Sequence, residues 1–527
     1  MDGRLELEEE KQDAPSQESV EISEVVNWKP SRRELLVMIS LAVINLMISL
    51  DATIVVTSIS TIVADLKGTA TQGFWVGTSY LLVSAVTMPV LAALSEIFGR
   101  PSCLLASLGF FTLGTILCCT AQHIDSLLIG RSIQGIGGGG ITILGLVIFT
   151  DIVPLRFRSK WYGVIQGAWA LGCCIGPVVG GAIVEHTTWR AIFYVMFPFC
   201  LFGFVVIPPL LTLKLPKTTL KERLLRVDWF GSFIFIASST SFLIAITWGG
   251  TEEPWGSFRT LLPLILGASG LLATGIWEAY GAREPFLRRS LFYCSSSYAA
   301  FIGAMVQGLL LYGQLYYIPL FFLSVSHASP VRTGVYLLPI MLALIPTSIV
   351  IGALVTRLGR FRWAIWSGWA IMTLGSGITI LWTTNTSTAT LLGTSVILGV
   401  GHGLVLNAQN FATQAICKPR EEGYAAAMYA FMRGSGMAIG VGIGGSVFQN
   451  VFRSKLIALD LDPTIAMNFE AFIFEMASLP DADEMKIKVL QACTFGFHGV
   501  YGFYTGQDKA LPGGYGEGTR EIIRIVT

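Results

Sequence analysis

Residues 162–184 read YGVIQGAWALGCCIGPVVGGAIV, a run without a single charged side chain. About 20 apolar residues in a helix span the hydrocarbon core of a bilayer, so this run predicts a membrane helix. Glycines four residues apart share one helix face and let a neighbouring helix approach closely, while a proline removes a backbone donor and favours a bend. We interpret the run as a gating helix, with Gly172, Gly176, Pro177, Gly180 and Gly181 as its working residues.

Runs of this kind recur along nearly the whole chain. Of its 527 residues, 53% are hydrophobic and only 13% are charged, which is too apolar for one soluble core. We therefore predict an all-α membrane protein that needs a lipid bilayer and has 13–14 transmembrane helices. A fourteenth span at 489–505 is doubtful, because that segment is short and contains His498. The thirteen clear spans are 35–56, 74–94, 102–121, 127–150, 162–184, 191–213, 229–248, 260–280, 298–324, 333–355, 363–383, 391–411 and 428–449.

Positive charge decides the predicted orientation. With the N-terminus in the cytosol, the cytosolic connections hold twenty Lys and Arg residues, and the opposite short connections hold four. Lys and Arg accumulate on the cytosolic side of multispanning proteins, which favours this orientation. The sequon at Asn385 then falls outside, and we predict glycosylation there. A net charge of +1, spread over loops, indicates no nucleic-acid partner.

Two patterns repeat at similar offsets. A loop pattern that ends in Gly99-Arg100 returns 260 residues later, ending in Gly359-Arg360, and the glycines of 172–181 return 264 residues later at 436–445. Close packing of membrane helices also produces glycines four apart. Two matched offsets nevertheless favour a duplicated six-helix unit with a binding site between the halves.

The repeat and the spans together predict how the chain is organised. We expect a disordered acidic cytosolic tail (1–34), an N-terminal six-helix half (35–213), a cytosolic linker with an inserted helix pair (214–280), a C-terminal half (281–450), and an outer loop with an atypical C-terminal segment (451–527).

Two ionisable residues lie at matching depth inside spans. Asp51 is about five residues from the outer end of the first span, and Arg131 is about four residues from the outer end of the fourth. An ionisable group in a membrane is costly unless it has a partner or faces a cavity. A carboxylate beside an arginine is a plausible proton switch, because protonating the acid frees the cation. A static structural pair and snorkelling to the interface remain alternatives.

Other residues in the spans carry weaker signals. Arg433 lies within the thirteenth span, where snorkelling explains it almost as well as function. His402 titrates near neutral pH in its free form, but a lone histidine is more often a packing residue. Aromatic side chains in the spans are able to line an apolar pocket, although they are also common at membrane interfaces. The candidate substrate pocket is Trp75, Tyr80, Gln134, Trp169, Tyr316 and Arg433.

Nothing in the sequence indicates a cofactor or a metal. The pattern Gly135-x-Gly137-x-x-Gly140 matches a dinucleotide fingerprint, but it lies mid-span and lacks the preceding strand that such a fold requires. The cysteines show no metal-ligand spacing, and no phosphate loop or hydrolase motif is present. We expect no cofactor, no metal and no enzymatic activity.

Several motifs resemble those of the major facilitator superfamily, in particular the fourteen-span drug:proton antiporters of fungi. Leu50-Asp51-x-Thr53-Ile54-Val55 is similar to the family's first-span motif, and Arg131-x-x-Gln134-Gly135-x-Gly137 to its fourth-span motif. The Gly163–Gly181 pattern matches the fifth-span antiporter motif, which the family associates with export. The loop Leu94-Ser95-Glu96-Ile97-Phe98-Gly99-Arg100 resembles a gating loop, which implies gating roles for Glu96, Gly99 and Arg100.

The resemblance implies a proton-coupled exporter of a small organic molecule, such as a toxin, drug or secondary metabolite. Its partners are then the substrate, protons and lipid, and we expect a monomer in the cell membrane, with the vacuolar membrane as the alternative. Departures from the family pattern include Ala92, Glu96 and Pro101 in the loop and the polar segment 507–527. An importer, for example of a siderophore, and a non-transporting paralogue are the competing readings.

Overall fold

The computed structural model describes residues 28–211, 219–250, 253–326, 328–418, 421–469, 472, 480 and 483–506. Most of the predicted acidic tail and all of 507–527 lie outside this range. Apart from one isolated bridge between Gly249 and Glu253, the described residues form helices, turns and loops without strands. The helices are α2 (Arg32–Ile54), α3 (Ile59–Asp65), α4 (Ala70–Phe98), α5 (Arg100–Thr120), α6 (Ile124–Ile152), α7 (Leu155–His186), α8 (Ala191–Tyr194), α9 (Phe197–Leu210), α10 (Leu220–Arg226), α11 (Trp229–Trp248), α12 (Phe258–Tyr280), η1 (Arg289–Phe292), α13 (Ser295–Ser324), α14 (Pro330–Leu358), α15 (Arg362–Thr379), α16 (Thr388–Ile416), α17 (Glu422–Ala458), η2 (Pro463–Asn468) and α19 (Glu484–Thr505).

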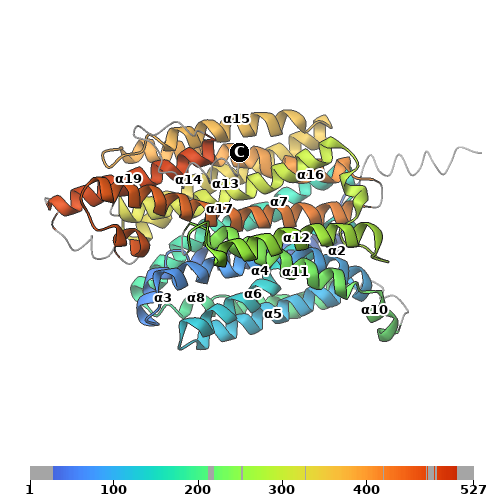
Figure 1. Cartoon of the computed structure of the whole chain (residues 1–527). Coiled ribbons are helices and arrows are strands. Elements are labelled where there is room, and N and C mark those ends of the chain that lie inside the picture. The colour runs from blue at the N-terminus through green and yellow to red at the C-terminus, as the bar shows by residue number, and fades with distance from the viewer. Residues whose placement is uncertain are drawn as a thin grey trace, which may run out of the picture.

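The long helices lie side by side in one bundle (Figure 1). Eleven spans among the described residues are long and apolar enough to cross a membrane, which confirms the all-α membrane fold. The predicted spans 363–383 and 428–449 form α15 and α17, which are helical but less apolar than these eleven spans. Their composition explains this, because α15 carries three tryptophans and α17 many glycines, and both residues are near neutral in hydropathy.

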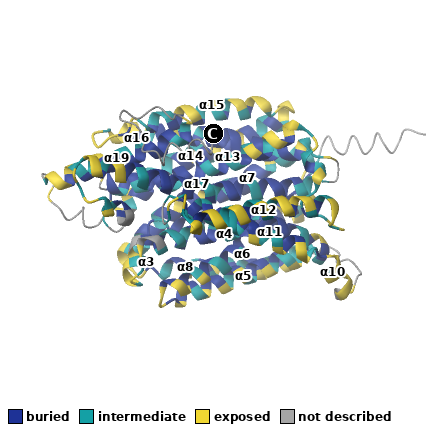
Figure 2. Cartoon of the chain, viewed as in Figure 1, coloured by how far each residue is buried: buried dark blue, intermediate teal, exposed yellow. Residues whose placement is uncertain are grey.

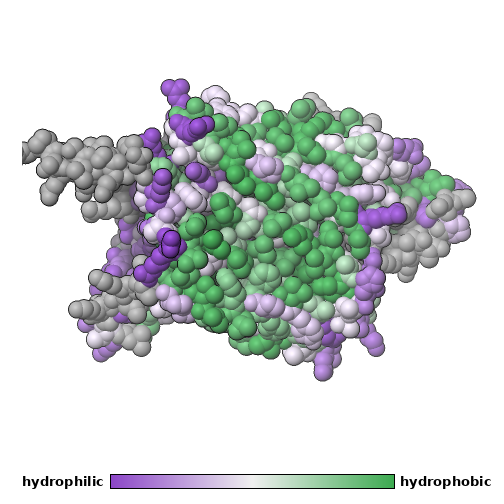
Figure 3. Space-filling view, turned by 180° about the vertical axis from the view of Figure 1, so that it is seen from behind, coloured by the Kyte–Doolittle hydropathy of each residue, from purple (hydrophilic) through white to green (hydrophobic). Residues whose placement is uncertain are grey.

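A broad hydrophobic band covers the face of the bundle seen in Figure 3. The space-filling view shows apolar residues as a broad band across one face, with hydrophilic residues gathered at its two ends (Figure 3). Large apolar side chains lie exposed on the bundle surface, among them Phe233 at 74% and Leu272 at 72% exposure. Lipid is the solvent that such a surface requires.

The short helices mark the two ends of the bundle. Helices α3 and α8 lie at one end and α10 lies at the other (Figure 1). We call these the outer and the inner end, after the orientation that the charges predict. At the outer end Trp189 and Arg190 donate hydrogen bonds to the Asp65 carboxylate at 2.8 and 3.2 Å. These two bonds lower the pKa of Asp65.

The same pairs of helices pack together in two sets. Helix α2 packs on α7, α4 on α6 and α5 on α6 in the first set. In the second set α13 packs on α17, α14 on α16 and α15 on α16, in the same order along the chain. The turn glycines of the repeated loop also match, since Gly99 and Gly359 both have positive φ, at 94° and 64°.

Two seams join the two sets. Along the first seam, α7 contacts α14 from the inner end, where Ser159 faces Gly352, to the outer end, where Val178 faces Gly334. Along the second seam, α4 packs on α17. Helix α11, from the predicted inserted pair, contacts both of these helices and so covers the second seam. The two sets therefore touch at both ends of the bundle.

Helix α19 occupies the segment whose ability to span is in doubt. It runs antiparallel to α17, with Gly496 against Phe448 and Tyr504 donating a hydrogen bond to the carbonyl of Gly440 at 3.1 Å. Gly440 is the central residue of α17, so the described part of α19 accompanies only the outer half of that helix. The segment is helical, but its described residues end at mid-depth.

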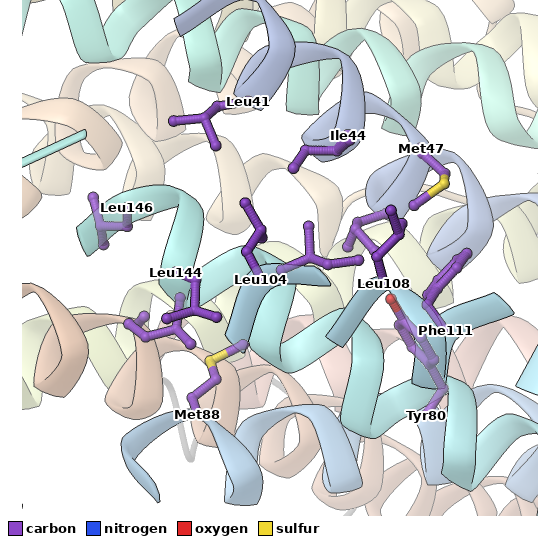
Figure 4. Close-up of a cluster of buried hydrophobic side chains, with 14 of the residues drawn as sticks. Leu41, Ile44, Met47, Tyr80, Met88, Leu104, Leu108, Phe111, Leu144 and Leu146 are labelled. Carbon is purple, nitrogen blue, oxygen red and sulfur yellow. The ribbon is translucent and has the colours of Figure 1, made fainter. Parts of the chain in front are cut away.

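A cluster of buried apolar side chains fills much of the core of the first set around α5. Buried positions fill the middle of the bundle, and exposed positions lie at its ends and its lipid-facing surfaces (Figure 2). Side chains from four helices converge there (Figure 4). The labelled members are Leu41, Ile44 and Met47 of α2, Tyr80 and Met88 of α4, Leu104, Leu108 and Phe111 of α5, and Leu144 and Leu146 of α6.

Candidate functional site

Asp51 and Arg131 form an ion pair inside the first set of helices. The Arg131 Nη1 atom lies 2.8 Å from Asp51 Oδ2, and both side chains are fully buried. Isolated, either charge would be strongly destabilising at this depth, so each depends on the other. Snorkelling, one of the alternatives for these residues, does not describe this arrangement, because neither group reaches the bundle surface.

Neutral groups complete the shell of this pair. Gln134 donates to Asp51 Oδ1 at 2.9 Å and to Thr115 at 3.0 Å, and it accepts from Arg131 Nη1 at 2.7 Å. Arg131 Nε donates to the carbonyl of Val76 at 3.0 Å. Its Nη2 atom is buried and has no hydrogen-bond partner among the described residues. A proton on Asp51 would weaken the Nη1 contact and leave the guanidinium free to turn toward another acceptor.

The second set of helices contains an uncharged polar network at positions that correspond, by the sequence repeat, to those of the ion-pair network in the first set. His402 Nε2 lies 2.9 Å from Gln314 Oε1, and Gln314 donates to Ser376 at 2.8 Å. Gln314 follows Asp51 by 263 residues, and Ser376 follows Thr115 by 261, close to the offsets of the sequence repeat. The two networks thus differ in charge, because only the network of the first set contains an acid and a cation.

A cavity lies at mid-depth between the two sets. Its volume is about 60 Å³. It is lined from α2, α4, α6 and α7 on one side and from α13 and α17 on the other. The lining residues are Asn45, Ile48, Ala52, Tyr80, Leu81, Ser84, Met88, Thr142, Leu146, Tyr162, Ile165, Gln166, Trp169, Tyr312, Tyr429, Ala430, Arg433, Gly434 and Met437.

Three of the six residues predicted for a substrate pocket line this cavity, namely Tyr80, Trp169 and Arg433. Gln134 lies instead in the ion-pair network. Trp75 packs edge-on against Trp248 of the inserted pair, with ring centroids 6.2 Å apart.

Tyr316 packs against Phe74, across the interface of α4 and α13, at a ring-centroid distance of 6.2 Å. It therefore also lies outside the cavity lining. The sequence did not show which aromatic residues line the cavity and which pack between two helices, because residues of both kinds are apolar and partly buried.

Tyr80 connects the ion pair to the cavity. Its ring lies under the Arg131 guanidinium, 4.5 Å from centroid to Cζ, and the same side chain lines the cavity. Its buried hydroxyl has no partner among the described residues. Ala52, which directly follows Asp51, lines the cavity as well. A rearrangement of the pair would therefore alter the cavity wall through these two residues.

The glycine row of α7 faces α2. A Cβ atom on Gly172 would lie 2.6 Å from the Leu46 carbonyl oxygen, and one on Gly180 would lie 2.3 Å from the Ile54 carbonyl oxygen. One on Gly176 would lie 2.1 Å from Thr53 Oγ1. Helices α2 and α7 thus touch backbone to backbone, and Asp51 lies on α2 within this contact.

Pro177 and Gly181 are buried on the same helix, which continues through the proline to His186. The carbonyl of Pro177 accepts a hydrogen bond from Thr57 at 3.3 Å. The proline therefore adds a polar link to the turn between α2 and α3 rather than ending α7.

The loop with the predicted gating residues bridges the two sets at the inner end. Arg100 contacts Glu96 at 3.3 Å and Asp151 at 3.1 Å, which ties α5 to the ends of α4 and α6. The Tyr424 hydroxyl of α17 donates a short hydrogen bond to Glu96 and accepts one from Arg288 at 2.8 Å. Glu96, a departure from the family pattern, thus bonds across the second seam. We call Glu96, Arg100, Arg288 and Tyr424 the inner latch.

Replacing Tyr424 with phenylalanine should open the inner end. The change removes a hydrogen bond to a carboxylate and one from a guanidinium at nearly constant shape. Hydrogen bonds to charged groups contribute about 1.5–3 kcal/mol each, so we expect at least a roughly tenfold faster labelling of a cysteine placed at Ser159, on the first seam. The rate is measured with a membrane-impermeant maleimide in inside-out vesicles, against the same variant without the Ser159→Cys change.

Tyr293→Phe is the matched control for this prediction. The Tyr293 hydroxyl donates to the Ile416 carbonyl at 2.7 Å, at the same end, but this bond joins the residues before α13 to α16 and crosses neither seam. Its loss should leave labelling at Ser159→Cys unchanged. Equal acceleration by both tyrosine changes would show that the latch does not hold the seam.

Several residues of these sites escaped the sequence analysis. Gln166, Gln314 and Tyr424 are common residue types without a motif of their own. Gln314 alone had a usable signal, because it stands at the repeat offset from Asp51. Asn385 is exposed in the loop between α15 and α16 at the outer end, and its glycosylation remains a prediction.

Comparisons with known proteins agree with this architecture. The chain is 39% identical over 434 residues to the MFS transporter L2 of Phoma sp., covering 82% of this chain and 73% of the relative. It is 35% identical over 448 residues to the MFS-type efflux pump LUC4 of Fusarium sp., covering 84% and 79%.

Among solved structures, the proton:xylose symporter XylE superposes with a TM-score of 0.56 at 13% identity, covering 89% of this chain and 98% of that one. This likeness concerns the fold alone. The family model of the Major Facilitator Superfamily matches residues 41–441, more than half of the chain. With this match and relatives above 30% identity, the chain belongs to the Major Facilitator Superfamily of membrane transporters.

Proposed function

We propose that this chain is a proton-coupled exporter of a small amphipathic organic molecule, working by alternating access between two duplicated halves. One observation carries the proposal: a fully buried carboxylate–guanidinium pair lies beside a mid-depth cavity and shares Tyr80 and Ala52 with its wall. A purely structural pair has no need of such a connection. The repeated helix pairs support the two halves, with 214–280 as the inserted segment.

The coupling step is the protonation of Asp51. A proton that enters from the outer side binds the Asp51 carboxylate and neutralises it, and Arg131 keeps its charge. The 2.8 Å contact between Arg131 and Asp51 then loses its ionic character and weakens, which frees the guanidinium to move with the Tyr80 ring beneath it. Because α2 and α7 touch backbone to backbone, a shift of α2 moves α7 and the first seam.

Two features support export over import. The glycine pattern of α7 matches the motif associated with antiporters, and one of the relatives carries the name efflux pump. The inner latch supports the gating roles of Glu96, Gly99 and Arg100. Gly99, at φ 94°, makes the turn that places Arg100 at the start of α5, where it reaches Glu96 and Asp151.

The sign of proton movement tests this proposal. The purified chain is placed in liposomes that contain a trapped pH dye, and a substrate is added outside. The probes are 2-naphthoate, 2-naphthamide and 2-naphthylmethylammonium, which share one aromatic body. An antiporter moves protons out as a probe enters, so the lumen becomes alkaline. Acidification would indicate a proton symporter, as an importer requires, and a signal equal to that of protein-free liposomes would indicate a non-transporting protein.

A further inference from the structure

The cavity wall contains one charged residue among its lining, Arg433 of α17. No Asp or Glu belongs to that lining. Arg433 is only 7% exposed, so water screens its charge poorly. The wall of the cavity therefore carries a positive charge with no acid of its own.

Arg433 has more hydrogen-bond donors than the protein uses. A guanidinium carries five N–H donors. The hydrogen bonds among described residues give its side chain one acceptor, Gln307 Oε1, which lies 3.2 Å from Nε. The Nη2 atom is buried and has no partner among these residues. A buried donor without an acceptor is costly, which favours a ligand that supplies the acceptor.

A second residue with an unpartnered donor lines the cavity from the opposite half. Gln166 of α7 lines the cavity, is buried, and its Nε2 atom has no hydrogen-bond partner among the described residues. Helices α7 and α17 belong to different sets, so Gln166 and Arg433 offer donors from both sides of the site. A carboxylate or an enolate oxygen accepts hydrogen bonds from both kinds of donor.

Aromatic rings define the rest of the site. The Arg433 guanidinium lies over the Trp169 ring at 4.7 Å, and Trp169 lies 6.3 Å from the Tyr312 ring. The ring of Trp169 holds the guanidinium in place from the α7 side. Tyr162 and Tyr429 extend the aromatic wall. These surfaces suit a flat apolar body attached to the acceptor group.

We propose that the cavity binds an organic anion, with its carboxylate or enolate at Arg433 and Gln166 and its aromatic or conjugated body against Trp169 and Tyr312. This inference deepens the proposed export function and rests on it for the claim that the bound anion is transported. A cationic amphiphile is excluded by the unscreened guanidinium, and a neutral one leaves the charge without a partner.

Competitive binding to the purified full-length chain tests the charge preference without transport. Equilibrium dialysis at neutral pH compares 2-naphthoate, 2-naphthamide and 2-naphthylmethylammonium. Hydrogen bonds to charged groups predict that 2-naphthoate binds about ten- to a hundredfold more tightly than either of the others. Equal binding of the three probes, or a preference for the ammonium, would overturn the proposal.

Substitutions at the two donors assign the preference to this site. Arg433→Gln should reduce 2-naphthoate binding to the level of the amide, and Arg433→Lys should retain part of it, because a lysine keeps the charge but not the planar fork. Gln166→Leu should weaken 2-naphthoate several-fold and leave 2-naphthamide little changed. If Arg433→Gln folds to a monodisperse protein and still prefers 2-naphthoate, the anion is bound elsewhere and the proposal fails.

Gln166→Glu provides a test in which one probe is expected to gain affinity. It places a carboxylate opposite Arg433 at nearly constant volume and so neutralises the site. The preference for 2-naphthoate should disappear while 2-naphthylmethylammonium gains affinity. An unchanged preference would contradict the assignment of Gln166 to the site.

Charge movement separates this inference from the proposed function. Exchange of one proton for one monoanion moves two elementary charges across the membrane, and exchange for a neutral amide moves one. A potassium diffusion potential should therefore change the flux of 2-naphthoate more than that of 2-naphthamide. Selective anion binding without proton exchange would refute the transport proposal alone, and proton exchange without any anion preference would refute this inference alone.

Discussion

Replacing Asp51 with asparagine is expected to abolish proton-coupled transport while leaving the protein folded in the membrane. The change removes the titratable charge at nearly constant volume. The amide oxygen of the introduced side chain is still able to accept from Arg131, which also keeps the Val76 carbonyl and Gln134 as partners. The proton signal in liposomes should fall to that of protein-free vesicles, whatever pH gradient is imposed. Binding of 2-naphthoate should remain, because Asp51 does not line the cavity.

This combination distinguishes a coupling role from a structural one. If the pair only stabilises the fold, Asp51→Asn should lower stability and leave proton exchange per folded molecule intact. Breaking a buried ion pair by removing one partner costs about 3–5 kcal/mol, so Asp51→Ala is expected to be the less stable variant. Proton exchange by Asp51→Asn at the wild-type rate across external pH would remove Asp51 from the mechanism.

Asp65→Asn is the matched control for Asp51. Asp65 also pairs with an arginine, Arg190, at 3.2 Å, but at the exposed outer end. Its lowered pKa keeps it ionised through the physiological range, so it does not take up the coupled proton. Its replacement should leave the pH dependence of transport unchanged.

Replacing Gly172 with alanine is expected to reduce transport at least tenfold. The added Cβ would lie 2.0 Å from Ser49 Oγ and 2.6 Å from the Leu46 carbonyl oxygen. The backbone oxygen is fixed in α2, so the helix itself has to shift, and α2 carries Asp51. Overpacking of this kind typically costs about 1–3 kcal/mol and displaces the ion pair from Gln134.

Gly167→Ala on the same helix provides the comparison. Its added Cβ would have its nearest contact at 3.7 Å from Ile345, which is ordinary van der Waals distance. Both changes gain the same helix propensity, about 1 kcal/mol, so the difference between them reports packing alone. Transport per folded protein and the unfolding temperature are measured for both. Equal activity of the two variants would refute the close-contact argument.

Much of the fold was predictable from the sequence because lipid imposes simple rules. Length and apolarity located the helices, and eleven of the spans meet both criteria in the structure. These criteria were weakest for α17, where glycines lower hydropathy although they are what brings α13 within contact at Gly436 and Gly440. Hydropathy therefore detects residues that face lipid, but it does not detect the glycines that allow two helices to pack closely.

The candidate site was only partly predictable. The rise of a helix places Asp51 and Arg131 at one depth, and their 2.8 Å contact agrees with that estimate. Their shared partner Gln134 also bonds Thr115, which comes from a third helix, and the position of Thr115 depends on how α5 packs on α6. No periodicity along one helix specifies that rotation, since polar residues such as threonine face either side of a membrane helix.

The sequence by itself determined the class of fold, the depth of the ionisable residues and the face of α7 that carries glycine. Each of these depends on one helix and the bilayer, and helical period and hydropathy describe both. Only the tertiary structure decided which side chains meet across helices: Tyr80 with Arg131, Tyr424 with Glu96, and Arg433 with Trp169. Such contacts depend on the rotation and tilt of two or more helices at once. The spacing of residues along one helix does not determine that rotation or tilt.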